Sequence, residues 1–204
     1  MTDSSARFSA PISAPRPRGS RLLTAFSPTL ERTVRAFDHH GLWQWVRLET
    51  DPQITSFREH PVRLGKDDDA RLIDFWVQRG DAEVLLVLGP RPRHRQDSGV
   101  SRRHCIAPRA GGRACRCRDL DHQLLRMLPV ITATRGLVPK NLLRAATNLV
   151  REPVALSLVE HELAVGDPSL VRGAIFELLR TGRLLAPSLH SQALSLHTTI
   201  EPAR

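Results

Sequence analysis

Apolar positions divide the chain into two patterned stretches with an irregular stretch between them. Up to about Pro90, short apolar runs have helical and then extended spacing, and after Asp119 they recur at intervals of three and four. The first residues are rich in Ser, Pro, Ala and Arg and have no apolar period. We expect four parts: a disordered tail (1–20), an ordered core (21–90), an irregular Arg/Cys-rich segment (91–118) and a helical domain (119–204).

Ser27-Pro28 predicts the start of a helix, because serine is a good N-cap and proline suits the first helical position. Apolar residues follow at helical spacing, at Leu30, Val34, Phe37, Gly41, Leu42 and Trp45. On this helix Glu31 lies about 100° from Leu30, at the edge of the apolar face. There its carboxylate could reach into a cleft. The alternative is a solvated first-turn residue that the helix dipole favours.

The stretch LIDFWVQRGDAEVLLVLGP, from Leu72 to Pro90, predicts two strands around a turn at Gly80-Asp81. Its VLLVL run is apolar on both faces, as expected of a central strand. Short extended runs precede it at Ile54–Phe57 and Pro61–Leu64. Asp74 is the one carboxylate near the start of the first strand of the pair.

The last third of the chain predicts three helices and a terminal hairpin. The helices are expected over 139–150, over 154–165 and from Pro168, with Gly182 just past the end of the last one. RLLAPSLHSQALSLHTTI then predicts a short hairpin. This order is typical of a winged-helix module that binds DNA or docks a protein, and the alternative is a plain helical domain. As exposed candidates for phosphate contact we select Arg172, Arg180 and Arg183.

Charge points to a polyanionic partner. The chain has 30 basic and 21 acidic residues, for a net charge of +9, and its only lysines are Lys66 and Lys140. Arginine pairs bidentately with phosphate, which favours nucleic acid as the partner. A GC-rich genome also enriches arginine, so composition alone leaves both explanations open. With no apolar run of membrane-spanning length and no apolar stretch in the first 20 residues, we expect a cytoplasmic protein without a membrane partner.

The colinear segments SPTLER, DPQITSFREHPVRL and RLIDFWVQRGDAEVLLVLGP resemble the N-terminal domain of TnsA-like endonuclease subunits of heteromeric cut-and-paste transposases. The resemblance covers about Phe26 to Pro90. It implies an α/β fold, with a restriction-endonuclease-like mixed sheet and flanking helices, ahead of the winged-helix-like domain. It also implies Mg²⁺-dependent phosphodiester cleavage, with Glu31 as the helix carboxylate and Asp74 as the strand carboxylate, both catalytic and metal-binding. The implied partners are DNA and a partner transposase or regulator protein.

The chain departs from the family pattern at its active-site positions. Val87 stands where the family has an acid or glutamine, and Gly89 stands where it has a lysine. His60 replaces a glutamine, and Ile73 replaces a proline. Glu83 lies about 13 Å along the strand from Val87, too far to share an ion. We therefore expect the endonuclease scaffold with weakened or lost cleavage. The alternative is a non-catalytic DNA- or protein-binding module for transposition or regulation.

Residues 91–118 hold all three cysteines and many arginines. A zinc site could use His104, Cys105, Cys115 and Cys117, but the C-x9-C-x-C spacing lacks the paired cysteines of common zinc motifs. A second interpretation is a basic arm for DNA phosphates. A third is a shifted reading frame, since a GC-rich gene read out of frame yields clusters of Arg, Cys, Gly, Pro and His.

Overall fold

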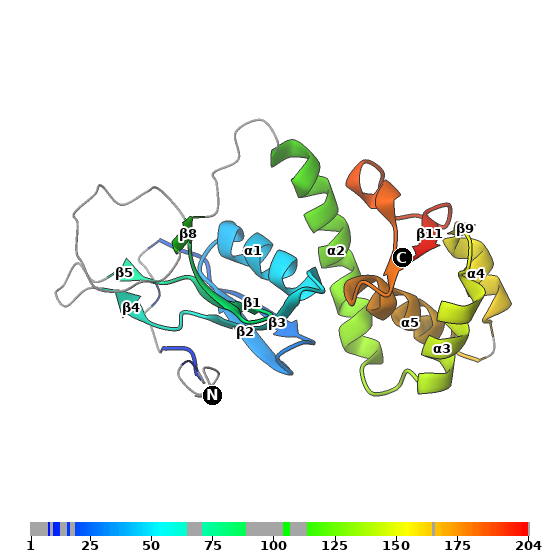
Figure 1. The fold of residues 1–204 in the computed structure, drawn as a ribbon, viewed down its shortest axis with the longest axis horizontal. Helices are drawn as coiled ribbons and strands as arrows, with labels where there is room; N and C mark the ends of the chain where they lie inside the picture. Colours follow the sequence, from blue (N-terminus) through cyan, green and yellow to red (C-terminus); the bar gives the residue numbers. More distant parts are fainter. Residues whose placement is uncertain are drawn as a thin grey trace. The chain divides into compact units, whose positions relative to one another are not determined.

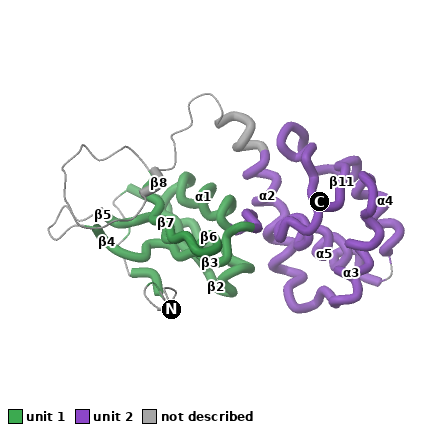
Figure 2. The backbone as a smooth tube through the Cα atoms, in the orientation of Figure 1, with its two compact units in different colours: residues 1–48, 53–111 green, residues 49–52, 112–204 purple. Residues whose placement is uncertain are grey.

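The structure is a computed structural model, and it describes residues 8, 10–12, 16, 19–64, 71–88, 104–106, 114–164 and 166–203. The chain forms two compact units (Figure 2). Unit 1 comprises residues 1–48 and 53–111, and unit 2 comprises residues 49–52 and 112–204. Both contain helices and strands, so the predicted α/β class is confirmed (Figure 1).

Unit 1 begins with a β-hairpin where the sequence predicted a helix. Strands β1 (Leu23–Ser27) and β2 (Arg32–Ala36) pair antiparallel, with Ser27 opposite Arg32. The predicted helix start at Ser27 is therefore wrong. The Ser27 hydroxyl instead accepts a hydrogen bond from the backbone N–H of Leu30 inside the turn, at 3.1 Å.

Alternation in β2 explains the error. Val34 and Ala36 are buried, whereas Thr33 and Arg35 between them are exposed, which is the two-residue period of a half-buried strand. Val34 also lies four residues from Leu30, so this apolar residue fits both the helical period and the two-residue period of a strand. Pairing of β2 with β1 stabilises the strand.

Helix α1 (His39–Thr50), most of which lies in unit 1, begins only after Asp38, whose carboxylate accepts a hydrogen bond from the backbone N–H of Gly41 at 2.7 Å. It buries Trp45, Val46 and Leu48. The second half of the predicted helix is thus confirmed, with a different N-cap.

A four-stranded mixed sheet forms the centre of unit 1 (Figure 1). Strands β3 (Ile54–Glu59), β6 (Phe75–Arg79) and β7 (Ala82–Val87) are antiparallel neighbours, and β8 (His104–Ile106) adds to β7 in parallel. The turn between β6 and β7 contains Gly80 at a φ of 54°, as the sequence predicted for this hairpin.

The strand predicted from Leu72 is interrupted. A separate two-stranded ladder pairs β4 (Arg63–Leu64) with β5 (Arg71–Leu72), and β6 starts only at Phe75. The residues between β5 and β6 are Ile73, which is fully buried, and Asp74, which is partly buried. The break places Asp74 at the very end of the β6–β7 ladder.

An N-terminal segment packs on the sheet, in contrast to the expected disordered tail. Phe8 is buried in a cluster with Ile73, Trp76, Leu85 and Val87, and its ring centroid lies 5.6 Å from that of Trp76. The Phe8 carbonyl accepts a hydrogen bond from Arg58 Nε at 3.0 Å, and Ile12 N–H donates to the His60 carbonyl at 2.8 Å. These contacts tie Phe8 and Ile12 to the sheet of unit 1.

The described residues of unit 2 form helices and a small sheet. The helices are α2 (Ala114–Thr134), α3 (Lys140–Leu149), α4 (Leu156–Glu162) and α5 (Pro168–Arg180). The sheet has the order β10 (Leu184–Leu185), β11 (Thr199–Pro202), β9 (Val154–Ala155), with both pairings antiparallel. A 3-10 turn, η2 (Pro187–His190), lies between β10 and β11. The helices predicted over 139–150 and from Pro168 and the terminal hairpin are confirmed. The helix predicted over 154–165 is shorter, because Val154–Ala155 form β9 and α4 ends at Glu162.

Helix α5 has the predicted ends and the predicted buried stripe. Asp167 caps its N-terminus by accepting a hydrogen bond from Ser169 N–H at 2.8 Å, and Pro168 opens the helix. At the C-terminus, Gly182 adopts a φ of 68°, and Arg183 N–H donates to the Leu178 carbonyl at 2.9 Å. This is the glycine-terminated pattern expected of a helix end.

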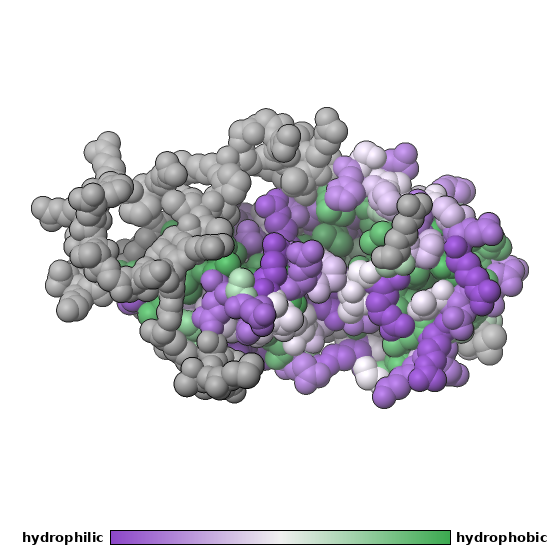
Figure 3. Space-filling view, in the orientation of Figure 1, coloured by the Kyte–Doolittle hydropathy of each residue, from purple (hydrophilic) through white to green (hydrophobic). Residues whose placement is uncertain are grey.

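Among the described residues, no helix is long and apolar enough to cross a membrane. The drawn face of unit 2 mixes hydrophilic and apolar side chains (Figure 3). Exposed large apolar residues of this unit include Leu137, Leu149, Leu158, Leu185 and Leu196. Single exposed leucines are common on protein surfaces, so they do not by themselves define a docking site.

Candidate functional site at the strand ends of unit 1

Asp74 lies at the strand ends where the sequence analysis placed the strand carboxylate. Its backbone N–H donates to the Leu86 carbonyl at 3.1 Å, and its own carbonyl accepts from His60 N–H at 2.9 Å. Its carboxylate accepts a hydrogen bond from the backbone N–H of Leu88 at 2.6 Å. The side chain thus closes the end of the β6–β7 ladder, a structural role that does not require a metal ion.

Val87, at the position that the family resemblance aligned with a third metal ligand, lies beside Asp74. Phe75 pairs with Leu86 in the sheet, so Asp74 and Val87 come next in the register. Val87 is only 8% exposed and packs with Ile73 and Leu85. An aliphatic side chain in a core offers no oxygen to Mg²⁺, which prefers oxygen ligands. Glu83 does not replace it, because its carboxylate accepts a hydrogen bond from Trp76 Nε1 at 3.1 Å.

Glu31 is the last residue of the β1–β2 turn and is exposed. Its backbone φ is 53°, in the left-handed region. It is therefore not a helix carboxylate, and α1 carries no acidic residue in its first turn. Across the part of the chain that the structure describes, no group of three His, Cys, Asp or Glu side chains could hold a metal ion. Among the described residues, no third side chain of these types therefore joins Glu31 or Asp74 in a cluster of ligands.

A buried ion pair lies next to Asp74. Arg32 donates from both terminal nitrogens to the two carboxylate oxygens of Glu59, each at 2.5 Å. The Glu59 side chain is 3% exposed and that of Arg32 27% exposed. Arg32 also lowers the pKa of neighbouring Arg58, although burial of Arg58 has the larger effect and Glu59 opposes both. This pair fixes the start of β2 against the end of β3.

His60 follows Glu59 in the chain, and its backbone N–H donates to the Asp74 carbonyl at 2.9 Å. Its imidazole stacks on Phe37, with ring centroids 4.7 Å apart and an interplanar angle of 17°. Its backbone has a φ of 46°, unusual for a residue other than glycine. Burial lowers the pKa of His60 below its ordinary value, and the nearby Glu59 carboxylate only partly offsets this. The ring is therefore neutral at pH 7.

A cavity of about 470 Å³ opens beside these residues. It is entirely within unit 1, between the N-terminal segment, β2 and the end of β3. Its polar and aromatic lining is made by Arg16, Arg32, Thr33, Arg35, Phe37, Glu59 and His60. Most of these residues were not selected from the sequence, because they come together from segments far apart in the chain. Among the cavity residues, only His60 was noted in the sequence, as a departure from the family pattern.

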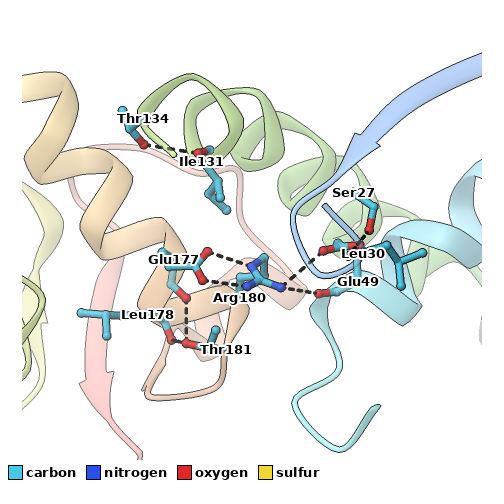
Figure 4. Close-up of polar contacts among 9 residues, drawn as sticks. All are labelled: Ser27, Leu30, Glu49, Ile131, Thr134, Glu177, Leu178, Arg180 and Thr181. Atoms are coloured by element: carbon cyan, nitrogen blue, oxygen red, sulfur yellow. Dashed lines mark hydrogen bonds and ion pairs between the residues drawn. The ribbon is translucent and has the colours of Figure 1, made fainter. Parts of the chain in front are cut away.

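In unit 2, the three arginines selected from the sequence differ in environment. Arg180 donates to both carboxylate oxygens of Glu177, at 2.6 and 2.8 Å, and to Glu49 at 3.3 Å (Figure 4). Burial opposes its charge, but hydrogen bonds and attraction to Glu177 and Glu49 raise the pKa of Arg180 overall. Its side chain is 13% exposed, so the expectation that Arg180 is exposed is wrong.

The other two are at the surface. Arg172 is exposed but paired with Glu160, through bonds of 2.6 and 2.8 Å. Arg183 is exposed. A phosphate would have to compete with Glu160 for Arg172, so only Arg183 keeps the predicted role without an internal competitor among the described residues.

Gly89, another predicted site residue, lies outside the described part of the chain. His104 and Cys105 are in β8, and Cys115 and Cys117 are in the first turns of α2, but their side chains are not described. The zinc, basic-arm and reading-frame interpretations of residues 91–118 therefore stay predictions. A comparison with protein-family models and with curated proteins finds no match for this chain.

Proposed function

We propose that this protein is a DNA-binding, transposon endonuclease-like subunit that has lost metal-dependent cleavage. The observation that carries the proposal is the neighbourhood of Asp74. A strand carboxylate is retained at the end of a mixed sheet, but Val87 beside it belongs to the apolar core. The scaffold of a nuclease without its ligand set fits a binding role better than a hydrolytic one.

The topology of unit 1 supports the family resemblance. Helix α1 precedes three antiparallel strands, β3, β6 and β7, and β8 then joins in parallel. A parallel neighbour requires a crossover, which here spans the segment between β7 and β8. This helix-and-mixed-sheet order is what a restriction-endonuclease-like core would have, with Asp74 at the start of its second strand.

The topology of unit 2 supports a winged-helix-like module. Strand β9 lies between α3 and α4, and β10 and β11 follow α5 as a hairpin in the same sheet. Helix α5 would be the DNA-reading helix of such a module. However, its exposed residues are Pro168, Ser169 and Arg172 only, and Arg172 is paired. We therefore propose that unit 2 docks a partner transposase or regulator protein, and that unit 1 provides most of the contact with DNA.

A supercoiled-plasmid assay with Mg²⁺ or Mn²⁺ tests the proposal, using Asp74→Asn as the comparison. Asparagine keeps an oxygen that can accept the Leu88 hydrogen bond, so the variant should fold. We expect salt-sensitive DNA binding without nicking by either protein. Metal-dependent nicking that Asp74→Asn abolishes would show an active nuclease. Failure to bind DNA at low salt would leave only the protein-docking module.

A further inference from the structure

The cavity of unit 1 carries an excess of positive charge. Three arginines and one carboxylate line it, from Arg16, Arg32, Arg35 and Glu59. Glu59 is fully engaged by Arg32. Among the described residues, Arg16 and Arg35 have no ion pair or side-chain hydrogen bond. Both arginines line the same hollow, and like charges placed together favour an anionic ligand.

The walls of the cavity are held in place by specific contacts. Ile12, which lines the cavity, is held next to the end of β3, because its N–H donates to the His60 carbonyl at 2.8 Å. Thr33 and Arg35 are both exposed and alternate with buried Val34, so both side chains leave the same face of β2. The stacked rings of Phe37 and His60 form an aromatic wall.

We propose that this cavity binds a phosphate group of a nucleic-acid strand, with Arg16 and Arg35 as its ligands. Guanidinium groups match the geometry of phosphate oxygens bidentately, and the Thr33 hydroxyl supplies a further donor. A volume of about 470 Å³ is within the range of small-ligand sites and so accommodates one nucleotide unit. The inference rests on the proposed function, since it names where unit 1 contacts DNA.

The test measures affinity of the full chain for a fluorescein-labelled single-stranded oligonucleotide by anisotropy over a series of salt concentrations. Arg16→Ala and Arg35→Ala should each weaken binding about tenfold, as expected for loss of a charge-assisted hydrogen bond. Each should also lower the slope of log affinity against log salt by about 1. Arg35→Lys keeps the charge but not the bidentate geometry, so it should keep the salt slope of the parent and lose part of the affinity.

Arg79→Ala is the matched control, because it removes an exposed arginine of the same unit. Arg79 lies four residues along β6 from Phe75, the residue paired with Glu59, which is about 13 Å from the cavity end of the sheet. Affinity within twofold of the parent is expected. Equal weakening by Arg79→Ala, or none by Arg16→Ala and Arg35→Ala, would overturn the cavity site and leave DNA binding by another surface.

A second experiment distinguishes binding of a single nucleotide from binding of a strand, and binding of phosphate from binding of other anions. Titration with 5′-dAMP, followed by amide NMR, should shift resonances of the cavity residues in the parent protein but not in Arg35→Ala. If dAMP binds in this way while the oligonucleotide does not, the cavity is a site for free nucleotides, and both the DNA-binding proposal and the inference of a strand-phosphate site fail. If polyglutamate displaces the oligonucleotide as well as polyphosphate does, the site does not select phosphate and the inference fails.

Discussion

Arg32 and Glu59 form a bidentate ion pair in which both nitrogen–oxygen distances are 2.5 Å and the carboxylate is almost completely buried. Replacing Arg32 with alanine should destabilise unit 1 by about 2–4 kcal/mol, because a buried charge is left without its partner. Chemical denaturation followed by tryptophan fluorescence reports this, since Trp45 and Trp76 are buried in the same unit.

The double variant Arg32→Met, Glu59→Leu separates the cost of an unpaired charge from the value of the pair. Apolar residues of similar volume leave no buried charge, so we expect it to be more stable than Arg32→Ala alone. A double variant that is less stable than the single one would mean that the pair itself, and not the stranded carboxylate, stabilises the unit.

Glu31→Gly should stabilise the β1–β2 hairpin by about 1 kcal/mol, because glycine adopts the left-handed conformation without steric cost. The φ of 53° at this exposed turn residue is the reason. Thr29→Gly, in the same turn, is the control and should give no such gain. Thermal unfolding measures both. The same variant tests the metal role. If Glu31 were a metal ligand, the parent protein would nick DNA with Mg²⁺ and Glu31→Gly would nick it less, whereas we expect no nicking by either protein.

Gly173→Ala should destabilise unit 2 by about 1–3 kcal/mol through overpacking. A Cβ at this position of α5 would lie 2.2 Å from Thr134 Oγ1 and 2.8 Å from Thr134 Cβ, at the end of α2. Combining it with Thr134→Ala should recover part of the loss, because the hydroxyl and methyl groups are removed and the Cβ is not. If the changes in unfolding free energy of the two single variants simply add in the double variant, the two helices do not meet at these residues.

Sequence patterns predicted unit 2 better than unit 1. The ends of α5 follow from local chemistry, since Asp167, Pro168 and Gly182 each act on the backbone next to them. The β1–β2 hairpin does not, because its apolar residues fit two periods and the choice depends on cross-strand pairing. The cavity was also beyond the sequence, since Arg16, Arg35 and His60 are far apart in the chain and meet only through the packing of three segments.

Stability of unit 1 should depend on pH through His60. Burial lowers the pKa of this histidine in the folded protein, so the unfolded chain binds the proton more tightly. The contribution of His60 to stability is therefore fully present above about pH 6.5, the pKa in the unfolded chain, and it falls as the pH decreases from there toward the lowered pKa of the folded protein.

His60→Gln should flatten the plot of denaturation midpoint against pH in this range, because glutamine has no proton to bind. The exposed His40, changed to Gln in a matched variant, should leave the profile as in the parent. Parallel profiles for His60→Gln and the parent would mean that other groups cause the acid sensitivity.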